Sequence, residues 1–419
     1  MRGWLFLVPL LILARSVAAA PDEALLGRDD GYPVAPRKAQ MNEPRYIVGS
    51  FSAFDSFGPH CLLAPAADSV PLPPAAPRPA LSYRYEGATY GLDDYLQHQR
   101  VTALLVLKDG RLEAERYGYG RSREMRMLSN SMAKTLLALA IGEALQDGAI
   151  HSLDDTADQY VPALAGTLYG QTRIVNLMRM ASGARFVEDY GPNDDRAAFN
   201  RVARRKGLVA AARGVTEREY AQGEHFSYAT AQSEILGLVL RAATRRDACS
   251  YIDEKLWQPM GAESAASYLL NPGDGVELLG GGFSATARDY ARLGQMLADD
   301  GRVRGRQVVP RPYLLDMTDP ARQPAAFRPG TMDSHGSHYL GYGYQVWLLP
   351  GDHRSFVLLG IYGQAIFVDP VLRLVMVHLA VAADARGDAS GAHLGRERDA
   401  LWRGLVAQFA TSPAQPQTH

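Results

Sequence analysis

Lysine and cysteine are scarce in this chain of 419 residues, and no stretch of one charge stands out. The 44 Lys and Arg residues are balanced by 45 Asp and Glu residues, which gives a formal net charge of -1. A protein that binds nucleic acid needs a basic surface to neutralise phosphates. Nucleic acid is therefore not an expected partner, and the 47% of hydrophobic residues indicates a globular protein with a large core.

Long hydrophobic runs are also absent after the first twenty residues, MRGWLFLVPLLILARSVAAA. These combine Arg2, an apolar stretch and small residues at 17–20, which is the pattern of a secretory signal peptide. A membrane span is disfavoured because the apolar run is short and ends at Arg15. We expect residues 1–20 to be removed and the mature protein to be periplasmic or secreted, without a stable membrane span.

The two cysteines, Cys61 and Cys249, lie far apart in the sequence. An oxidising compartment would permit a disulfide between them, but a chain of this length needs no such link, and two buried free thiols are an equal alternative. His335 and His338 lack nearby cysteines and a helical H-E-x-x-H frame. We therefore expect no metal site and no cofactor.

The order of elements indicates an α/β (α+β) fold. The predicted segments are a signal peptide at 1–20, a proline-rich extension that wraps the core at 21–91, a first part of the α/β domain at 92–150, a helical domain at 151–275, a second part of the α/β domain at 276–410, and a polar tail at 411–419. The first part contains a hairpin around Lys108-Asp109-Gly110 and an apolar helix, and the second part contains short β-rich segments and a final helix. This order predicts an antiparallel sheet built from both chain ends and flanked by helices, with an inserted, mostly helical domain.

The stretch SNSMAKT, residues 129–135, places Lys134 three positions after Ser131 at the start of an apolar helix. Residues three apart lie on one helix face, so the hydroxyl and the amine can meet. The helix start provides unpaired backbone N–H groups that stabilise an oxyanion. Burial and the positive helix end favour the neutral amine, which can take the serine proton. Ser131 is thus a candidate nucleophile, and Lys134 is its candidate base.

The alternative is that Ser131 only caps the helix and Lys134 is a solvated side chain. The chain has five lysines, so a serine three positions before one of them is no rare accident. The continuation LLALAIGEAL indicates, however, a buried helix, and arginine carries most of the positive charge. A general acid is also needed. Tyr228 is the candidate, because it lies where a turn leads into an apolar helix, although any of the 21 tyrosines could instead be an ordinary core or surface aromatic residue.

These residues resemble the serine β-lactamase and penicillin-binding-protein superfamily, whose Ser-x-x-Lys motif carries the nucleophile. Ser131 and Lys134 match this motif, and Tyr228-Ala229-Thr230 follows 97 residues after the serine (228 minus 131). Further matching segments are LDDTADQYVPAL, IVNLMRMASGARFVEDY, GEHFSYATAQSEILGLVL, KLWQPMGAE, GGGFSATARDYARLGQML and GIYGQAIFVDP. The resemblance covers residues 92–382 and is closest to the class C branch, which includes esterases and 6-aminohexanoate-dimer hydrolases.

The resemblance implies an acyl-enzyme mechanism in which Ser131 attacks an ester or amide carbonyl, Lys134 acts as base and Tyr228 passes the proton to the leaving group. It also implies an oxyanion hole formed by the backbone N–H groups of Ser131 and Gln364, with Tyr362 in the same motif. Tyr190 matches the loop tyrosine that dimer hydrolases close over an amide substrate. An exposed aromatic residue on a flexible loop is the alternative for Tyr190.

Two departures from the family pattern argue against β-lactamase activity. Ile361-Tyr362-Gly363 stands where β-lactamases carry Lys-Thr-Gly, and Thr230 stands where many relatives place Asn. The cation that would hold the carboxylate of an antibiotic is therefore missing. Four carboxylates near Tyr190 could bind a substrate amine, although a solvated acidic loop is the favoured interpretation. They are Glu188, Asp189, Asp194 and Asp195.

We therefore expect an exported serine hydrolase that acts on a small ester or short amide. The alternatives are a β-lactamase or D-alanyl-D-alanine peptidase, and a non-catalytic binding protein of the same fold.

Overall fold

A computed structural model describes residues 20–332, 339–386 and 394–411 of the chain. Its central feature is a seven-stranded antiparallel sheet with the strand order β11-β12-β13-β14-β15-β4-β5. The strands are β4 (Val101–Lys108), β5 (Arg111–Tyr117), β11 (Gly341–Tyr342), β12 (Trp347–Leu348), β13 (Phe356–Gly360), β14 (Gln364–Asp369) and β15 (Leu374–Ala380). The β4–β5 hairpin pairs with β15 from the other end of the chain, which confirms the predicted sheet.

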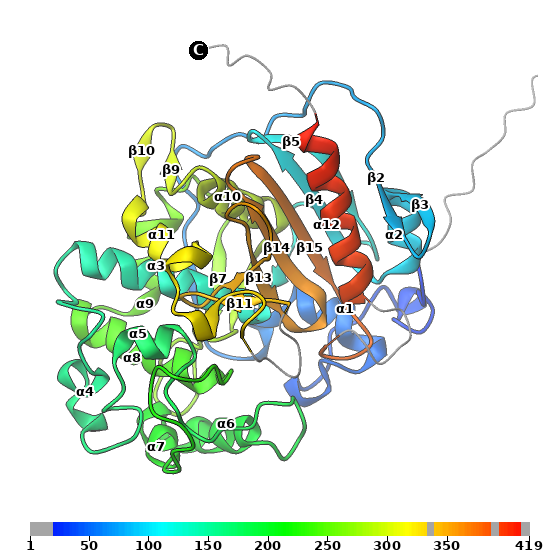
Figure 1. Cartoon of the computed structure of the whole chain (residues 1–419). Helices are drawn as coiled ribbons and strands as arrows, with labels where there is room; N and C mark the ends of the chain where they lie inside the picture. The colour runs from blue at the N-terminus through cyan, green and yellow to red at the C-terminus, as the bar shows by residue number, and fades with distance from the viewer. Residues whose placement is uncertain (1–19, 333–338, 387–393, 412–419) are drawn as a thin grey trace, which may run out of the picture.

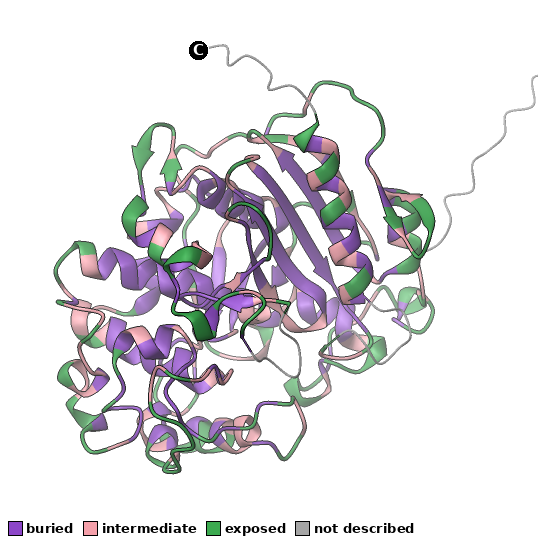
Figure 2. Ribbon diagram, in the orientation of Figure 1, coloured by how far each residue is buried: buried purple, intermediate pink, exposed green. Residues whose placement is uncertain are grey.

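The middle strands of this sheet are buried on both faces. Every residue of β14 and β15 is buried, and seven of the eight residues of β4 are buried as well. The helix α12 (Leu394–Ala410) covers one face, and α10 (Ala287–Ala298) packs against the other (Figures 1 and 2). The strands therefore contain continuous apolar runs instead of an alternating pattern.

The helical region lies beside the sheet and encloses the apolar helix predicted from the sequence (Figure 1). That helix is α3 (Ala133–Gln146), and it contacts α8 and α9. The other helices of this region are α4 (Ala157–Tyr160), α5 (Ile174–Met178), α6 (Asp195–Lys206), α7 (Leu208–Arg213), α8 (Thr230–Thr244) and α9 (Ala248–Ile252). The elements β9 (Arg302–Val303), β10 (Arg306–Gln307) and α11 (Arg311–Thr318) follow α10 in the chain and lie above the helical region in the view of Figure 1.

A second, four-stranded sheet was not predicted. Its strands are β1 (His60–Leu63), β7 (Ala266–Leu269), β8 (Phe283–Thr286) and β6 (Arg126–Leu128), in that order. They are only three or four residues long, and β7 and β8 are wholly buried, so no alternation marks them in the sequence. The chain just after β6 and just before β8 reaches the candidate site.

The proline-rich extension contains more regular structure than its composition suggested. Besides β1 it forms α1 (Pro44–Ser52), β2 (Ser82–Tyr85) and β3 (Ala88–Gly91), followed by α2 (Leu92–His98). Pro44 occupies the first turn of α1, where a missing N–H carries no cost. Five residues of α1 are buried, so this part of the extension belongs to the core.

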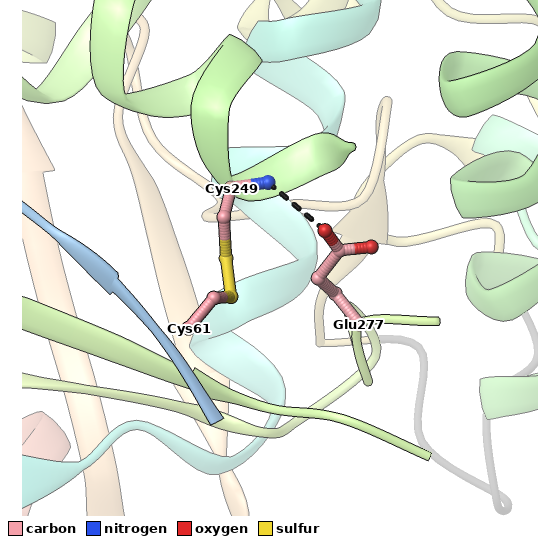
Figure 3. Close-up of side chains that lie close together, drawn as sticks. All are labelled: Cys61, Cys249 and Glu277. Carbon is pink, nitrogen blue, oxygen red and sulfur yellow. Dashed lines mark hydrogen bonds between the residues drawn. A yellow bond between two sulfur atoms is a disulfide. The ribbon is translucent and has the colours of Figure 1, made fainter. Parts of the chain in front are cut away.

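A disulfide joins Cys61 in β1 to Cys249 in α9 and settles the alternative left open by the sequence (Figure 3). It ties the extension to the helical region. Glu277 lies beside it, and the three side chains are close enough to hold a metal ion. The sulfurs are bonded to each other, however, and the carboxylate of Glu277 accepts hydrogen bonds from the Cys249 N–H at 3.2 Å and from Arg241 at 2.7 Å. The cluster is therefore explained as structural.

Within the described part of the chain, no helix combines the length and the apolar composition needed to cross a bilayer. The expected signal peptide, apart from Ala20, and the two histidines His335 and His338 lie outside the described residues.

Candidate active site

Ser131 lies in a tight turn between strand β6 and helix α3. The 3₁₀ turn Asn130–Met132 leads directly into the helix, and Ser131 is partly exposed while Met132 is buried. Asn130 adopts φ 47°, which is costly for a residue with a side chain. Its side chain donates a hydrogen bond to the Ile361 carbonyl at 3.0 Å. The turn therefore holds the serine hydroxyl in a fixed position beside the C-terminal end of β13.

Lys134 points into the same place from the first turn of α3. Its Nζ lies 3.0 Å from Ser131 Oγ and 3.1 Å from Thr230 Oγ1, and it also donates a hydrogen bond to the Gly280 carbonyl. Only 1% of the residue is exposed. The structure thus brings Ser131 and Lys134 together as their spacing predicted, and the solvated alternative for Lys134 is wrong.

The hydrogen-bond partners of Lys134 are compatible with a neutral amine. The Thr230 hydroxyl donates its proton to Glu188 Oε1 at 2.6 Å, so it can only accept from Lys134. The Gly280 carbonyl also only accepts. These two acceptors use both N–H groups of a neutral amine, and the lone pair is left to face the Ser131 hydroxyl.

Burial is the main influence on the charge of Lys134. It lowers the pKa of the amine, whereas the nearby carboxyl groups of Glu188 and Glu234 oppose this effect. Burial also raises the pKa of both Glu188 and Glu234, and Lys134 opposes that rise. The pKa of Lys134 is therefore below its ordinary value, as a general base near neutral pH requires.

Tyr228 lies two residues before the start of α8 and approaches Ser131 and Lys134. Its ring lies 5.2 Å from Lys134 Nζ. Burial raises the pKa of Tyr228 well above its ordinary value, while the neighbouring Ser131 side chain opposes the rise. The phenol consequently keeps its proton at neutral pH. The ring stacks on Trp347 at 5.9 Å between centroids, which fixes its orientation.

The turn that carries Gln364 packs against the serine turn. At Gly360, a Cβ atom would stand 2.4 Å from the Ser129 carbonyl oxygen, so only glycine permits this approach. The side chain of Gln364 is buried and donates to the Ala380 carbonyl at 2.7 Å. Only the backbone of Gln364 is therefore left to serve the site.

Tyr362 belongs to the same turn and has φ 61°. Its ring meets Phe51 of α1 edge to face, with 5.5 Å between centroids. The extension thus holds the aromatic ring of Tyr362 from one side.

Tyr190 lies on the loop before α6, partly buried and with φ 67°. Its backbone N–H donates to Asp194 at 2.9 Å, and the Arg196 guanidinium lies 5.5 Å from its ring centre. Tyr190 also contributes to the raised pKa of Tyr228, which places the two side chains near each other. The alternative of an exposed aromatic residue is therefore wrong.

The acidic segment after Phe186 is not the solvated loop that was favoured. Glu188 and Asp194 are buried, whereas Asp189 is exposed. Glu188 accepts hydrogen bonds from both the N–H and the hydroxyl of Thr230, each at 2.6 Å. Its contact with Thr230 was missed. The sequence carries no local signal for it, because residues 185–188 read RFVE without alternation and the contact joins residues 42 apart.

Gly280 opens the matching segment GGGFSATARDYARLGQML, and its place in the structure is specific. A Cβ atom there would stand 2.6 Å from Thr230 Cγ2 and 2.7 Å from Glu234 Oε1. The missing side chain lets the backbone approach α8 closely enough for its carbonyl to accept from Lys134.

A family model described as Beta-lactamase matches residues 92–399, which is well over half of the chain. The chain belongs to this Beta-lactamase family. The resemblance predicted from the Ser-x-x-Lys and Tyr-Ala-Thr motifs is thereby confirmed, and the chain is a serine hydrolase.

Several known proteins are similar to this Beta-lactamase family member. A 6-aminohexanoate-dimer hydrolase from Paenarthrobacter ureafaciens is 27% identical over 304 residues, which cover 69% of this chain and 74% of the relative. A Bacillus anthracis protein assigned as a 6-aminohexanoate-dimer hydrolase superposes with a TM-score of 0.78 at 22% identity, covering 91% of this chain and all of that one. EstCE1, described as a hydrolase with promiscuous acyltransferase activity, gives a TM-score of 0.55 at 18% identity and covers 74% of this chain and 96% of its own. At these identities the two solved structures show the shared fold.

Proposed function

We propose that this protein is an exported serine hydrolase that cleaves ester or short amide bonds, with Ser131, Lys134 and Tyr228 as its catalytic residues. The observation that carries the proposal is the buried amine of Lys134, 3.0 Å from the Ser131 hydroxyl and held by two groups that only accept. The relatives support the substrate class, because one is named for hydrolysis of the 6-aminohexanoate dimer.

In the proposed reaction, Ser131 Oγ attacks the carbonyl carbon of the substrate and gives its proton to Lys134 Nζ. The tetrahedral intermediate collapses and breaks the bond to the leaving group, which takes a proton by way of Tyr228. The acyl group remains as an ester on Ser131. A water molecule then attacks this ester, its proton passes back through the same groups, and the acid product leaves with Ser131 restored.

The oxyanion of the intermediate would be bound by the backbone N–H groups of Ser131 and Gln364. The close approach at Gly360 supports this assignment, because it puts the end of β13 against the serine turn. An oxyanion-hole donor contributes about 3 to 4 kcal/mol to transition-state stabilisation in enzymes of this kind. Tyr190, which lies near Tyr228, and Tyr362 would border the substrate on the outer side.

The turn before Gln364 disfavours a β-lactam substrate. Ile361 stands in this turn in place of the cation that would pair with an antibiotic carboxylate. Phe226, Tyr342 and Trp347 pack around Tyr228, with ring centroids 5.9 to 6.4 Å away, and hold its ring in place. A β-lactamase or D-alanyl-D-alanine peptidase remains the second candidate because the chain shares their family.

Export is part of the proposal. It is supported by the signal-like pattern of the first twenty residues and by the Cys61–Cys249 disulfide, since such bonds persist mainly in oxidising compartments. Fractionation of the native host, with N-terminal sequencing of the mature protein, tests it. We expect a periplasmic or secreted protein that begins near residue 21, and a cytoplasmic protein that keeps residues 1–20 would contradict export.

The reaction is tested with purified protein, a p-nitrophenyl ester and a chromogenic cephalosporin. We expect ester turnover that disappears in Ser131→Ala and persists in Ser56→Ala, which changes an exposed serine. Cephalosporin turnover of comparable efficiency would instead favour the β-lactamase. If neither substrate reacts and an acyl-trapping phosphonate does not label Ser131, the protein is a non-catalytic member of the family.

A further inference from the structure

His378 is a wholly buried histidine in β15 that has no part in the reaction described above. Its Nδ1 lies 2.6 Å from the carbonyl oxygen of Gly363, and its Nε2 lies 2.9 Å from the hydroxyl of Tyr95 in α2. The imidazole therefore connects a helix on the outer side of the sheet to the turn beside the serine.

The partners fix which nitrogen carries the proton. A carbonyl oxygen only accepts, so Nδ1 must donate to Gly363. In the neutral ring Nε2 then accepts from the Tyr95 hydroxyl. Burial lowers the pKa of His378 to about 3, so the ring is neutral at ordinary pH. One tautomer with two defined hydrogen bonds results.

The carbonyl of Gly363 and the N–H of Gln364 are parts of one peptide group. The described residues contain no cis peptide bond, so this C=O and this N–H point in opposite directions from a planar unit. A donor that fixes the carbonyl thereby fixes the direction of the N–H. A hydrogen bond at the carbonyl also polarises the amide and strengthens its N–H as a donor.

The rest of the turn is held by other donors. Asn130 donates to the Ile361 carbonyl at 3.0 Å, and the Ala382 N–H donates to the Tyr362 carbonyl at 3.1 Å. Gly363 itself has φ 92°, and a Cβ atom there would stand 2.6 Å from Leu394 Cδ2. The Gly363–Gln364 peptide group, by contrast, is held by the side chain of His378.

We propose that His378 is a positioning residue of the oxyanion hole, which orients and polarises the Gly363–Gln364 peptide through its Nδ1–H. The inference rests on the proposed function, because the Gln364 N–H matters only if an oxyanion forms on a substrate bound at Ser131. His378 touches neither the substrate nor the reacting atoms, so it acts entirely through this peptide.

The test compares two amide side chains at position 378. The Nδ2 of Asn occupies the place of the histidine Nδ1 and keeps a donor toward Gly363, whereas the amide of Gln reaches only the place of Nε2. We expect His378→Gln to lower kcat for a p-nitrophenyl ester about 10- to 100-fold with little change in KM, because the oxyanion-hole donor is displaced but not deleted. We expect His378→Asn to stay within about threefold of the wild type, as a rescue of the lost donor.

Wild-type turnover and labelling of Ser131 by a phosphonate are measured first, so that failure of the proposed function is recognised separately. Given an active wild type, equal losses in His378→Asn and His378→Gln, or losses in neither, would overturn the inference. Nitrogen-15 spectra of the wild-type imidazole supply a readout that does not depend on a variant being folded. We expect the Nδ1–H tautomer unchanged from about pH 5 to about pH 8, whereas an Nε2–H tautomer or a titration in that range contradicts the proposal.

Discussion

Lys134 shows how burial turns an ordinary cation into a base. Its amine is enclosed at the start of α3, and two of its three polar contacts can only accept hydrogen bonds. Arginine in this place would keep its charge and could not take the proton from Ser131. Lys134 therefore contributes as a proton acceptor and not as a positive charge.

We predict that Lys134→Arg lowers kcat/KM for a p-nitrophenyl ester by about 10³-fold or more, in the upper range for loss of a general base. Steady-state kinetics measure the effect. Lys206→Arg, on the exposed side of α6, is the matched control and should behave as the wild type. Turnover of Lys134→Arg at near the wild-type rate would remove the role assigned to this residue.

Glu188, which accepts a hydrogen bond from the Thr230 hydroxyl, also influences the pKa of the Lys134 amine. Because its negative charge raises the pKa of Lys134, it stabilises the ammonium form. Activity needs the neutral amine, so kcat/KM should rise with pH as Lys134 loses its proton. We predict that Glu188→Gln lowers the pKa of Lys134 further and moves this acidic limb of the pH profile to lower pH. The exposed neighbour Asp189→Asn is the control, and it should leave the limb in place. A limb that moves to higher pH in Glu188→Gln contradicts the assignment.

The contact between β13 and the serine turn depends on Gly360, which approaches Ser129 too closely for any side chain. We predict that Gly360→Ala separates the two segments and lowers kcat/KM about 10- to 100-fold, since small misplacements of catalytic groups have effects of this size. Gly395→Ala, in α12, is the matched control because a Cβ atom there meets nothing within 4 Å. Unchanged kinetics in a folded Gly360→Ala protein would show that this close approach does not set the oxyanion hole.

Elements with strong local signals were predictable. The β4–β5 hairpin, the buried helix α3 and the late strands β13 to β15 follow from turn residues and apolar runs, and the structure confirms them. The β1-β7-β8-β6 sheet was not predictable, because its short buried strands pair across long sequence separations. The same limit applies to the site. The spacing of Ser131 and Lys134 is local to one helix, whereas the contacts of Glu188 with Thr230 and of His378 with Gly363 arise only from tertiary packing.

At the scale of the whole molecule, the N-terminal extension links parts of the chain that are far apart in sequence. Residues of this extension pair with β7, pack α1 against Tyr362 and form the disulfide to α9. The family model begins at residue 92, so the extension itself lies outside the residues that this model matches. These contacts connect the extension to the helical region and to the turn that precedes Gln364.

We predict that the double variant Cys61→Ala/Cys249→Ala is less stable than the oxidised protein by about 2 to 4 kcal/mol, because the bond limits the unfolded chain. Urea unfolding followed by circular dichroism measures the difference. A reductant should destabilise the wild type and leave the double variant unchanged. Equal stability, together with two titratable thiols in the untreated wild type, would contradict the disulfide.

The central claim is that Ser131 becomes acylated with Lys134 as its base, and the most direct measurement is mass spectrometry of the protein quenched during turnover of a slowly deacylating ester. We expect a single acyl adduct on the peptide that contains Ser131 in the wild type and in Lys206→Arg, and no adduct at Ser131 in Lys134→Arg over the same time. An adduct on another residue, or equal acylation of Ser131 in Lys134→Arg, would contradict the account.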